Sequence, residues 1–303
     1  MRLRTPRLDF VVIGAQKSGT TSLWRYLEDH SAVRMPSDKE APFFSEPSYP
    51  DDLRAYMRAL FKHAPRDAKL GTVTPTYMHG APGVSVPEIA ERISATCPHV
   101  RLIALLRDPV DRAASAHRMA VRVSGERRSF REAIEELLTP EALERARAGA
   151  GQTNSYVVAG EYGRMLSAYL ERFDRGQLHV ELTADLAREP GAVVERVCAH
   201  IGVEPHRPRR LGQRFYEGGQ PLVPAAAEAE LKCYLDQNVW PRVRQSGQHR
   251  SAFEHWFRLW NVDPALTAEP PDERTAARLR EHYADDAVRL AAAAGIRPPW
   301  LES

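Results

Sequence analysis

The sequence predicts an α/β fold built on a central, mostly parallel sheet that is flanked by helices. Strand-like and helix-like patterns alternate along residues 8–201, as expected for parallel strands joined by crossover helices. Two of the strand-like runs, residues 8–13 and 100–106, are apolar on both faces, so helices are expected to cover both sides of the sheet. After residue 205 the alternation stops, which predicts a helical C-terminal extension.

The elements of the first half follow from their own patterns. The strand at 8–13 leads through a glycine-containing loop at 14–19 into a helix at 20–29 whose apolar residues recur at helical spacing. Prolines break residues 31–50 into loops. Hydrophobic spacing then predicts a helix at 51–63, a strand at 70–73, a helix at 87–96, a strand at 100–106 and a helix at 111–121.

The second half is expected to be mainly helical. The predicted elements are two helices within 129–148, a helix at 161–173, a strand at 178–182, a helix at 191–201, and further helices near 225–238, 251–260 and 272–294. We therefore predict an α/β domain at 1–220 and a helical extension at 221–303 that packs on the same domain.

The composition argues against several classes of protein. The 303 residues include 42 basic and 40 acidic side chains, a net charge of +2, whereas nucleic-acid binding needs a concentrated basic face. The three cysteines are widely spaced and no histidine motif has metal-ligand spacing, so we expect no disulfide, no metal site and a cytoplasmic location. The apolar run at 10–13 is too short for a membrane span or for the core of a signal peptide.

The strongest local motif is the loop from Gly14 to Thr21, which directly follows a strand and directly precedes a helix. Its glycines permit a tight turn, and amides at the start of a helix favour an anion, to which Lys17 adds a full positive charge. The glycine spacing matches the phosphate loop of nucleotidases, but Thr20 stands where those proteins have lysine. The motif therefore predicts a phosphate site whose positive charge comes from inside the loop, with no metal implied.

Two blocks together resemble the sulfotransferase family. The Lys17 loop is similar to that family's 5'-phosphosulfate-binding loop, and residues 101–117 resemble its 3'-phosphate-binding segment. In the second block an apolar strand ends at Arg107, and Ser115 follows two turns into the next helix. The resemblance covers roughly residues 8–220 and is nearest to heparan-type sulfotransferases and their bacterial relatives. It implies a three-layer fold like that of P-loop proteins.

The resemblance also implies the co-substrate, 3'-phosphoadenosine-5'-phosphosulfate, and the product adenosine 3',5'-bisphosphate. A looser similarity places residues 214–219 over the adenine and the 3'-phosphate. The residues implied in binding the nucleotide are Gln16, Lys17, Ser18, Gly19, Thr20, Thr21, Arg107, Ser115, Arg214 and Tyr216.

A third block, Lys-Glu-Ala-Pro-Phe-Phe at 39–44, implies that Glu40 is the general base. An acceptor hydroxyl must lose a proton as it attacks sulfur, and a carboxylate shielded from water is a stronger base. Lys17 is then placed to stabilise the charge that develops on the leaving oxygen during in-line displacement. The residues implied in contacting the acceptor are Glu40, Phe44, Thr74, Tyr77 and Tyr162.

The sequence departs from the family in a fourth block, residues 71–77. Thr72 and Val73 occupy positions where many relatives have glutamate and lysine. Lys69, Lys39 and His79 are alternative sources of the missing positive charge.

The nature of the acceptor and two other functions stay open at this point. A sulfotransferase of this type would modify a hydroxyl or an amine on a sugar, glycolipid or secondary metabolite, and the sequence favours a bacterial, cytoplasmic enzyme with no membrane span. A P-loop kinase would need lysine at position 20 and a magnesium-binding aspartate. A non-catalytic binding protein on the same fold would fit the missing lysine near Val73.

Overall fold

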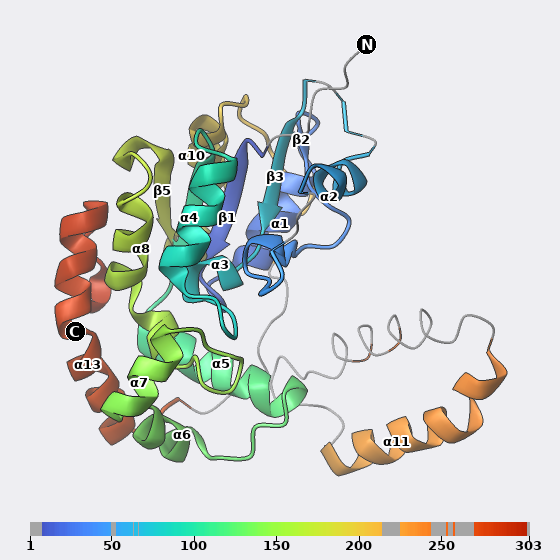
Figure 1. Cartoon of the computed structure of the whole chain (residues 1–303), viewed down its shortest axis with the longest axis vertical. Helices are drawn as coiled ribbons and strands as arrows, with labels where there is room; N and C mark the ends of the chain where they lie inside the picture. The colour runs from blue at the N-terminus through green and yellow to red at the C-terminus, as the bar shows by residue number, and fades with distance from the viewer. Residues whose placement is uncertain are drawn as a thin grey trace. The chain divides into compact units, whose positions relative to one another are not determined.

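The computed structural model describes residues 8–49, 53–62, 64–65, 67–213, 225–243, 253, 257 and 270–301. The described residues form a five-stranded sheet in which every pairing is parallel (Figure 1). The strands lie in the order β2 (Val33–Arg34), β3 (Lys69–Val73), β1 (Phe10–Gly14), β4 (Arg101–Leu106) and β5 (Leu178–Leu182). The predicted fold class is confirmed.

The two central strands are the ones that the sequence showed to be apolar on both faces. All five residues of β1 are buried, and β4 is buried from Leu102 to its end. Val11 pairs with Thr72 on one side and Leu102 on the other. Because these strands are parallel and adjacent, the loops that follow β1 and β4 leave the sheet at the same edge.

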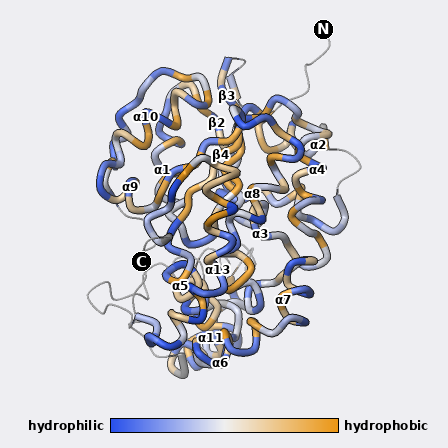
Figure 2. Tube along the Cα trace, turned by 90° about the vertical axis from the view of Figure 1, so that its left-hand side faces the viewer, coloured by the Kyte–Doolittle hydropathy of each residue, from blue (hydrophilic) through white to orange (hydrophobic). Residues whose placement is uncertain are grey.

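Helices cover both faces of this sheet. α1 and α10 contact one another on one face, whereas α3, α4 and α8 lie together on the other (Figure 1). Figure 2 shows the apolar residues concentrated along the strands and the inner sides of these helices. The helices of this part of the chain are α1 (Thr20–Glu28), α2 (Leu53–Leu60), α3 (Thr76–His79), α4 (Val86–Thr96), α5 (Pro109–Val123), α6 (Phe130–Leu137), α7 (Pro140–Arg147), α8 (Tyr162–Leu170), α9 (Thr183–Arg188) and α10 (Pro190–Ile201). Short 3-10 helices lie at η1 (Pro42–Phe44), η2 (Val158–Gly160) and η3 (Arg175–Gln177).

The start of α5 is set by the sequence Arg-Asp-Pro that follows β4. The Asp108 carboxylate accepts hydrogen bonds from the backbone amides of Val110, at 2.8 Å, and Asp111, at 3.1 Å. Pro109 occupies the first position of the helix, where a missing amide costs nothing. α5 therefore begins directly beyond the carboxyl end of β4, with Arg107 at the junction.

The chain divides into two compact units, one of Met1–Gln213 with Pro271–Ser303 and one of Arg214–Pro270. The second unit contains α11 (Ala225–Asn238) and η4 (Trp240–Arg242). In the first unit, α13 (Glu273–Ala294) precedes η5 (Pro299–Leu301). The boundary placed near residue 220 from the sequence stays a prediction.

α13 packs closely on α8. The Asp286 carboxylate accepts from the amides of Gly163, at 2.7 Å, and Arg164, at 2.8 Å, at the start of α8. The Tyr283 hydroxyl donates to the Val157 carbonyl at 2.8 Å. These contacts join the C-terminal helix to the α/β sheet's outer layer. Within the described residues, no helix is both long enough and apolar enough to cross a membrane.

Candidate active site

The loop between β1 and α1 is wound tightly against the end of β4. The Ala15 amide donates to the Leu105 carbonyl at 2.8 Å, and the Ser18 amide donates to the Ala15 carbonyl at 3.2 Å. Lys17 and Gly19 both have left-handed backbone angles, with φ of 68° and 89°. Any side chain at Gly19 would be strained at that angle, and its Cβ would lie 3.2 Å from Leu186.

The N-terminus of α1 is left open for an anion. Gly19 is its N-cap and supplies no side-chain hydrogen bond, and no acidic residue lies in its first turn. The unpaired amides and the helix dipole at such an end attract negative charge.

Lys17 is a cation held among other cations. Its pKa is lowered to about 8, first by burial and then by the positive charges of Arg122, Arg107, Lys39 and Arg118, of which Arg122 acts most strongly. No ion pair involves Lys17 within the part of the chain that is described. A buried cation without a carboxylate is costly, so the site is electrostatically prepared for an anionic ligand.

Arg107 lies at the carboxyl end of β4, next to the Lys17 loop. Its guanidinium donates to the Asp111 carboxylate at 3.2 Å, and its charge is one of those that act on Lys17. Ser115 is half-buried two turns into α5. The structure thus brings Lys17 and Arg107 to neighbouring strand ends, which is the arrangement that the two sequence blocks predicted.

Two hydroxyl groups, one half-buried and one buried, fix these strand ends relative to each other. The Thr183 hydroxyl lies 2.8 Å from the Ser18 carbonyl and 3.1 Å from the Leu106 carbonyl, so it links the loop to β4. The Tyr162 hydroxyl donates to the Arg107 carbonyl at 2.9 Å. Thr183 was not identified from the sequence. The only sequence signal was its place immediately after the strand at 178–182.

Glu40 lies beside this group of cations, joined to it through Lys39. The two side chains form an ion pair at 3.4 Å, with Lys39 18% exposed and Glu40 48% exposed. Burial lowers the pKa of Lys39, whose charge in turn acts on Lys17. The shielding from water that the sequence argument assumed for Glu40 is therefore not present in the described residues.

Three residues predicted to contact an acceptor are buried in or under the segment that carries Glu40. Phe44 is fully buried in η1. The Tyr77 hydroxyl donates to the Ala41 carbonyl, and the Thr74 hydroxyl accepts from the Ala41 amide at 3.1 Å. These contacts anchor Ala41, next to Glu40, to the end of β3. Direct contact of Phe44, Thr74, Tyr77 or Tyr162 with an acceptor stays a prediction.

The three alternatives for the missing lysine are now distinguishable by position. Lys69 pairs with Asp9 at 3.5 Å at the amino ends of β3 and β1, the opposite edge of the sheet. His79 is buried, and this burial lowers its pKa to about 4, so it is neutral near pH 7. Of the three, Lys39 is the one whose charge acts on Lys17.

Two further cations near Lys17, Arg118 and Arg122, were missed in the sequence. They follow Ser115 by three and seven residues on α5, so all three lie on one face of the helix. That spacing was a readable signal. Arg214 and Tyr216 lie outside the described residues, as does the rest of the predicted adenine segment.

His117 is a packing residue on α5. Its ring lies edge-on to Phe130 and Tyr156, and its Nε2 lies 2.8 Å from the Arg128 carbonyl. Among the described residues, no group of three or more His, Cys, Asp or Glu side chains is placed to hold a metal ion.

The sequence of this chain is similar to that of proteins of one family. The sequence model of the family described as "Sulfotransferase domain" matches residues 7–216. The bifunctional heparan sulfate N-deacetylase/N-sulfotransferase 1 of Xenopus tropicalis is 29% identical over 208 residues, which are 66% of this chain and 22% of that protein. The heparan sulfate glucosamine 3-O-sulfotransferase 3B1 of Mus musculus is 31% identical over 196 residues, 64% of this chain and 46% of that protein.

A solved structure extends the similarity over nearly the whole chain. The crystal structure of a sulfotransferase from Alicyclobacillus acidocaldarius is 26% identical, with a TM-score of 0.67, and the match covers 98% of this chain and 100% of that one. Two curated relatives, one of them the Xenopus tropicalis protein, are much longer than this chain. The match spans only 23% and 22% of their respective lengths.

Proposed function

This chain belongs to the sulfotransferase family, and on that premise we propose that it transfers a sulfuryl group from 3'-phosphoadenosine-5'-phosphosulfate to a hydroxyl or amine of an acceptor. The observation that carries the proposal is the placement of Lys17 and Arg107 on the ends of two adjacent strands, with no carboxylate paired to Lys17 in the described residues. A nucleotide with phosphate groups at both ends fits two such cationic positions.

The residues present suit the two ends of the co-substrate. The amides at the start of α1 and the Lys17 ammonium would bind the 5'-phosphosulfate. Arg107 and Ser115 would bind the 3'-phosphate, with a forked guanidinium donor and a hydroxyl. The predicted contribution of Arg214 and Tyr216 remains part of this proposal.

The reaction is an in-line displacement at sulfur. The acceptor oxygen or nitrogen forms a bond to sulfur while the bond from sulfur to the 5'-phosphate oxygen breaks, and adenosine 3',5'-bisphosphate leaves with the electron pair. Lys17 stabilises the charge that develops on the leaving oxygen. Glu40 takes the proton of the acceptor, and its carboxylate is oriented by the ion pair with the neighbouring Lys39.

The nucleophile of the proposed acceptor is a hydroxyl or an amine, carried by a sugar, glycolipid or secondary metabolite. The relatives named for heparan sulfate support a sugar acceptor. Cytoplasmic location and bacterial origin are predictions from the sequence.

The test is incubation of the protein with isotope-labelled sulfate donor and a panel of hydroxyl and amine acceptors, followed by mass spectrometry. We expect an acceptor to gain one sulfuryl group, and Lys17→Ala and Glu40→Gln to reduce that yield strongly. Glu46→Gln is the matched control, because Glu46 is exposed on the same segment and should leave activity unchanged. Wild-type activity in both Lys17→Ala and Glu40→Gln would refute the mechanism, whereas no transfer to any acceptor by the wild type would favour a binding protein.

A second measurement separates this function from that of a kinase. Adenosine 3',5'-bisphosphate should raise the melting temperature without any metal, because it binds the folded state. Stabilisation by ATP with magnesium, and none by the bisphosphate, would favour a P-loop kinase instead.

A further inference from the structure

α5 runs across the carboxyl end of the sheet rather than alongside its strands (Figure 1). Its first turn follows directly from β4, and its later turns pass below the ends of the neighbouring strands. One face of the helix is therefore able to face the Lys17 loop along much of its length.

That face carries Ser115, Arg118 and Arg122, at spacings of three and four residues. The two arginines are half-buried. Other charged residues of α5 have partners: Arg112 donates to the Tyr156 carbonyl, and Asp111 pairs with Arg107. Neither Arg118 nor Arg122 has a hydrogen bond or ion pair within the described ranges.

The charges of both arginines act on Lys17, that of Arg122 more strongly than that of Arg118. The pKa of Arg118 is lowered by burial and then by the charge of Arg107. Arg122 is the charge that acts most strongly on Lys17, ahead of Arg107 and Lys39. Arg122 therefore carries the charge that most affects Lys17, the residue proposed to bind the 5'-phosphosulfate.

Holding Arg122 and Lys17 together without a carboxylate costs free energy in the empty protein. An anion that binds between them removes the repulsion and gains a charge-assisted hydrogen bond from each. We propose that Arg122 is a second cationic contact for the 5'-phosphosulfate group, binding its oxygens together with Lys17. This inference rests on the proposed function and adds a residue to it.

In the transfer step, Arg122 would share with Lys17 the negative charge that collects on the 5'-phosphate oxygen as its bond to sulfur breaks. The electron pair of that bond stays on the departing adenosine 3',5'-bisphosphate. Arg122 neither gains nor loses a proton.

The test compares nucleotides that differ at the 5' end, by titration calorimetry with the full chain. Arg122→Gln should weaken binding of adenosine 3',5'-bisphosphate by about 10- to 100-fold, the effect of one charge-assisted hydrogen bond. Binding of adenosine 3'-phosphate, which has no 5'-phosphate, should change by less than about twofold, within the scatter expected for a residue that does not touch the ligand. Arg122→Lys should recover part of the loss because it keeps the charge.

Arg278→Gln on α13 is the matched control, since Arg278 is an exposed helical arginine that is not among the residues of the site. It should leave both affinities unchanged. Equal affinity of Arg122→Gln and wild type for the bisphosphate, or equal losses for both nucleotides, would overturn the inference alone. Failure of the wild type to bind the bisphosphate would overturn the proposed function and the inference with it.

Discussion

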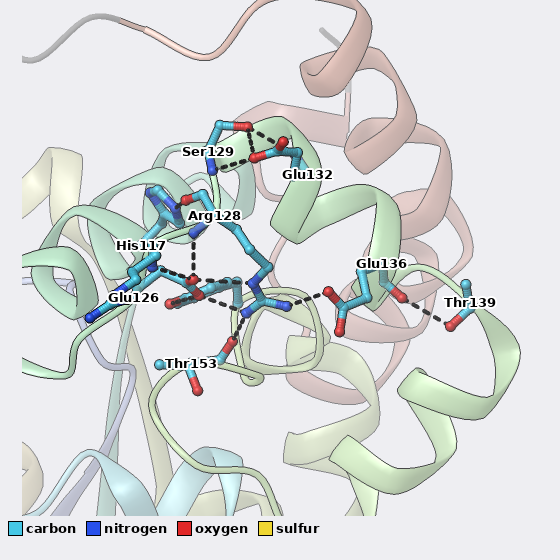
Figure 3. A network of polar contacts seen from close by, with 10 residues as sticks. His117, Glu126, Arg128, Ser129, Glu132, Glu136, Thr139 and Thr153 are labelled. Atoms are coloured by element: carbon cyan, nitrogen blue, oxygen red, sulfur yellow. Dashed lines mark hydrogen bonds and ion pairs between the residues drawn. The ribbon is translucent and has the colours of Figure 1, made fainter.

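Two groups of charged residues in the same unit are built on opposite principles. The charges that shift the pKa of Lys17 are all positive, and burial with this repulsion lowers the pKa to about 8. Around Arg128, by contrast, negative side chains pair with the positive one (Figure 3). Arg128 pairs with Glu126 at 2.6 Å and with Glu136 at 2.8 Å, and donates to the Thr153 carbonyl at 2.7 Å.

Both pKa shifts are downward, but a lowered pKa favours the charged form of a carboxyl and disfavours the charged form of an amine. Hydrogen bonds from Arg128 lower the pKa of Glu126 to about 2, whereas burial lowers the pKa of Lys17. Ionisation of Glu126 therefore stabilises the fold, and ionisation of Lys17 opposes it. The comparison indicates that the Arg128 group serves the structure, and that the Lys17 group is left unpaired so that a ligand can pair with it.

The largest effect should come from Lys17→Ala. Loss of a donor at the developing charge should lower kcat by about 10²- to 10³-fold. The melting temperature of the empty protein should stay the same or rise, because a buried unpaired charge is removed. Lys62→Ala, at an exposed position, is the control for both readings. A large loss of stability in Lys17→Ala would break the contrast between the two groups.

The next largest effect should come from Arg128→Met, which disrupts the paired group of charges rather than the unpaired one. The Glu126 side chain is 4% exposed, and its carboxylate would lose its charged partner. We expect the free energy of unfolding to fall by about 2–4 kcal/mol in chemical denaturation, with kcat of the folded enzyme unchanged. Arg131→Met removes an exposed pair with Asp272 and should cost about 0–1 kcal/mol. Similar losses in the two variants would show that the Arg128 group is no more than surface charge.

The smallest effect is in the pH dependence. Lys17 is charged below its pKa of about 8, so kcat/KM should fall as the pH rises above that value. The fall should be about tenfold per pH unit, as for loss of one proton. A profile that stays level to pH 10 would contradict the position given to Lys17.

The free energy of unfolding should change at acidic pH, whereas kcat/KM changes at alkaline pH. The carboxyl of Glu126 has a pKa of about 2 when folded, against an ordinary value of 4.5. Its stabilisation is therefore complete above about pH 4.5 and is lost as the pH falls toward 2. Acid titration of unfolding in wild type and Glu126→Gln measures this contribution, because the variant lacks it.

The sequence predicted well whatever depends on local pattern. β1, β4 and the Lys17 loop were identifiable because continuous apolar runs and glycine spacing act over a few residues. The shared edge of Lys17 and Arg107 followed from parallel strand order, and pairing of β1 with β4 confirms it.

The sequence was less informative where side chains meet across the fold. Thr74 and Tyr77 read as possible acceptor contacts, but their hydroxyls are used to anchor Ala41. The sequence did not indicate that Arg118 and Arg122 belong to the site, because this depends on the direction in which α5 crosses the ends of the strands. Periodicity gave their helical face, but the path of the helix depends on tertiary packing.

The central claim is that Lys17 and Arg107 bind opposite ends of one nucleotide, and calorimetry with three ligands tests it directly. The ligands are adenosine 3',5'-bisphosphate, adenosine 5'-phosphate and adenosine 3'-phosphate. Arg107→Ala should abolish the affinity that the 3'-phosphate adds, and Lys17→Ala the affinity that the 5'-phosphate adds, each by about tenfold or more. If both substitutions remove the contribution of the same phosphate, or if neither changes any of the three affinities, the claim is contradicted.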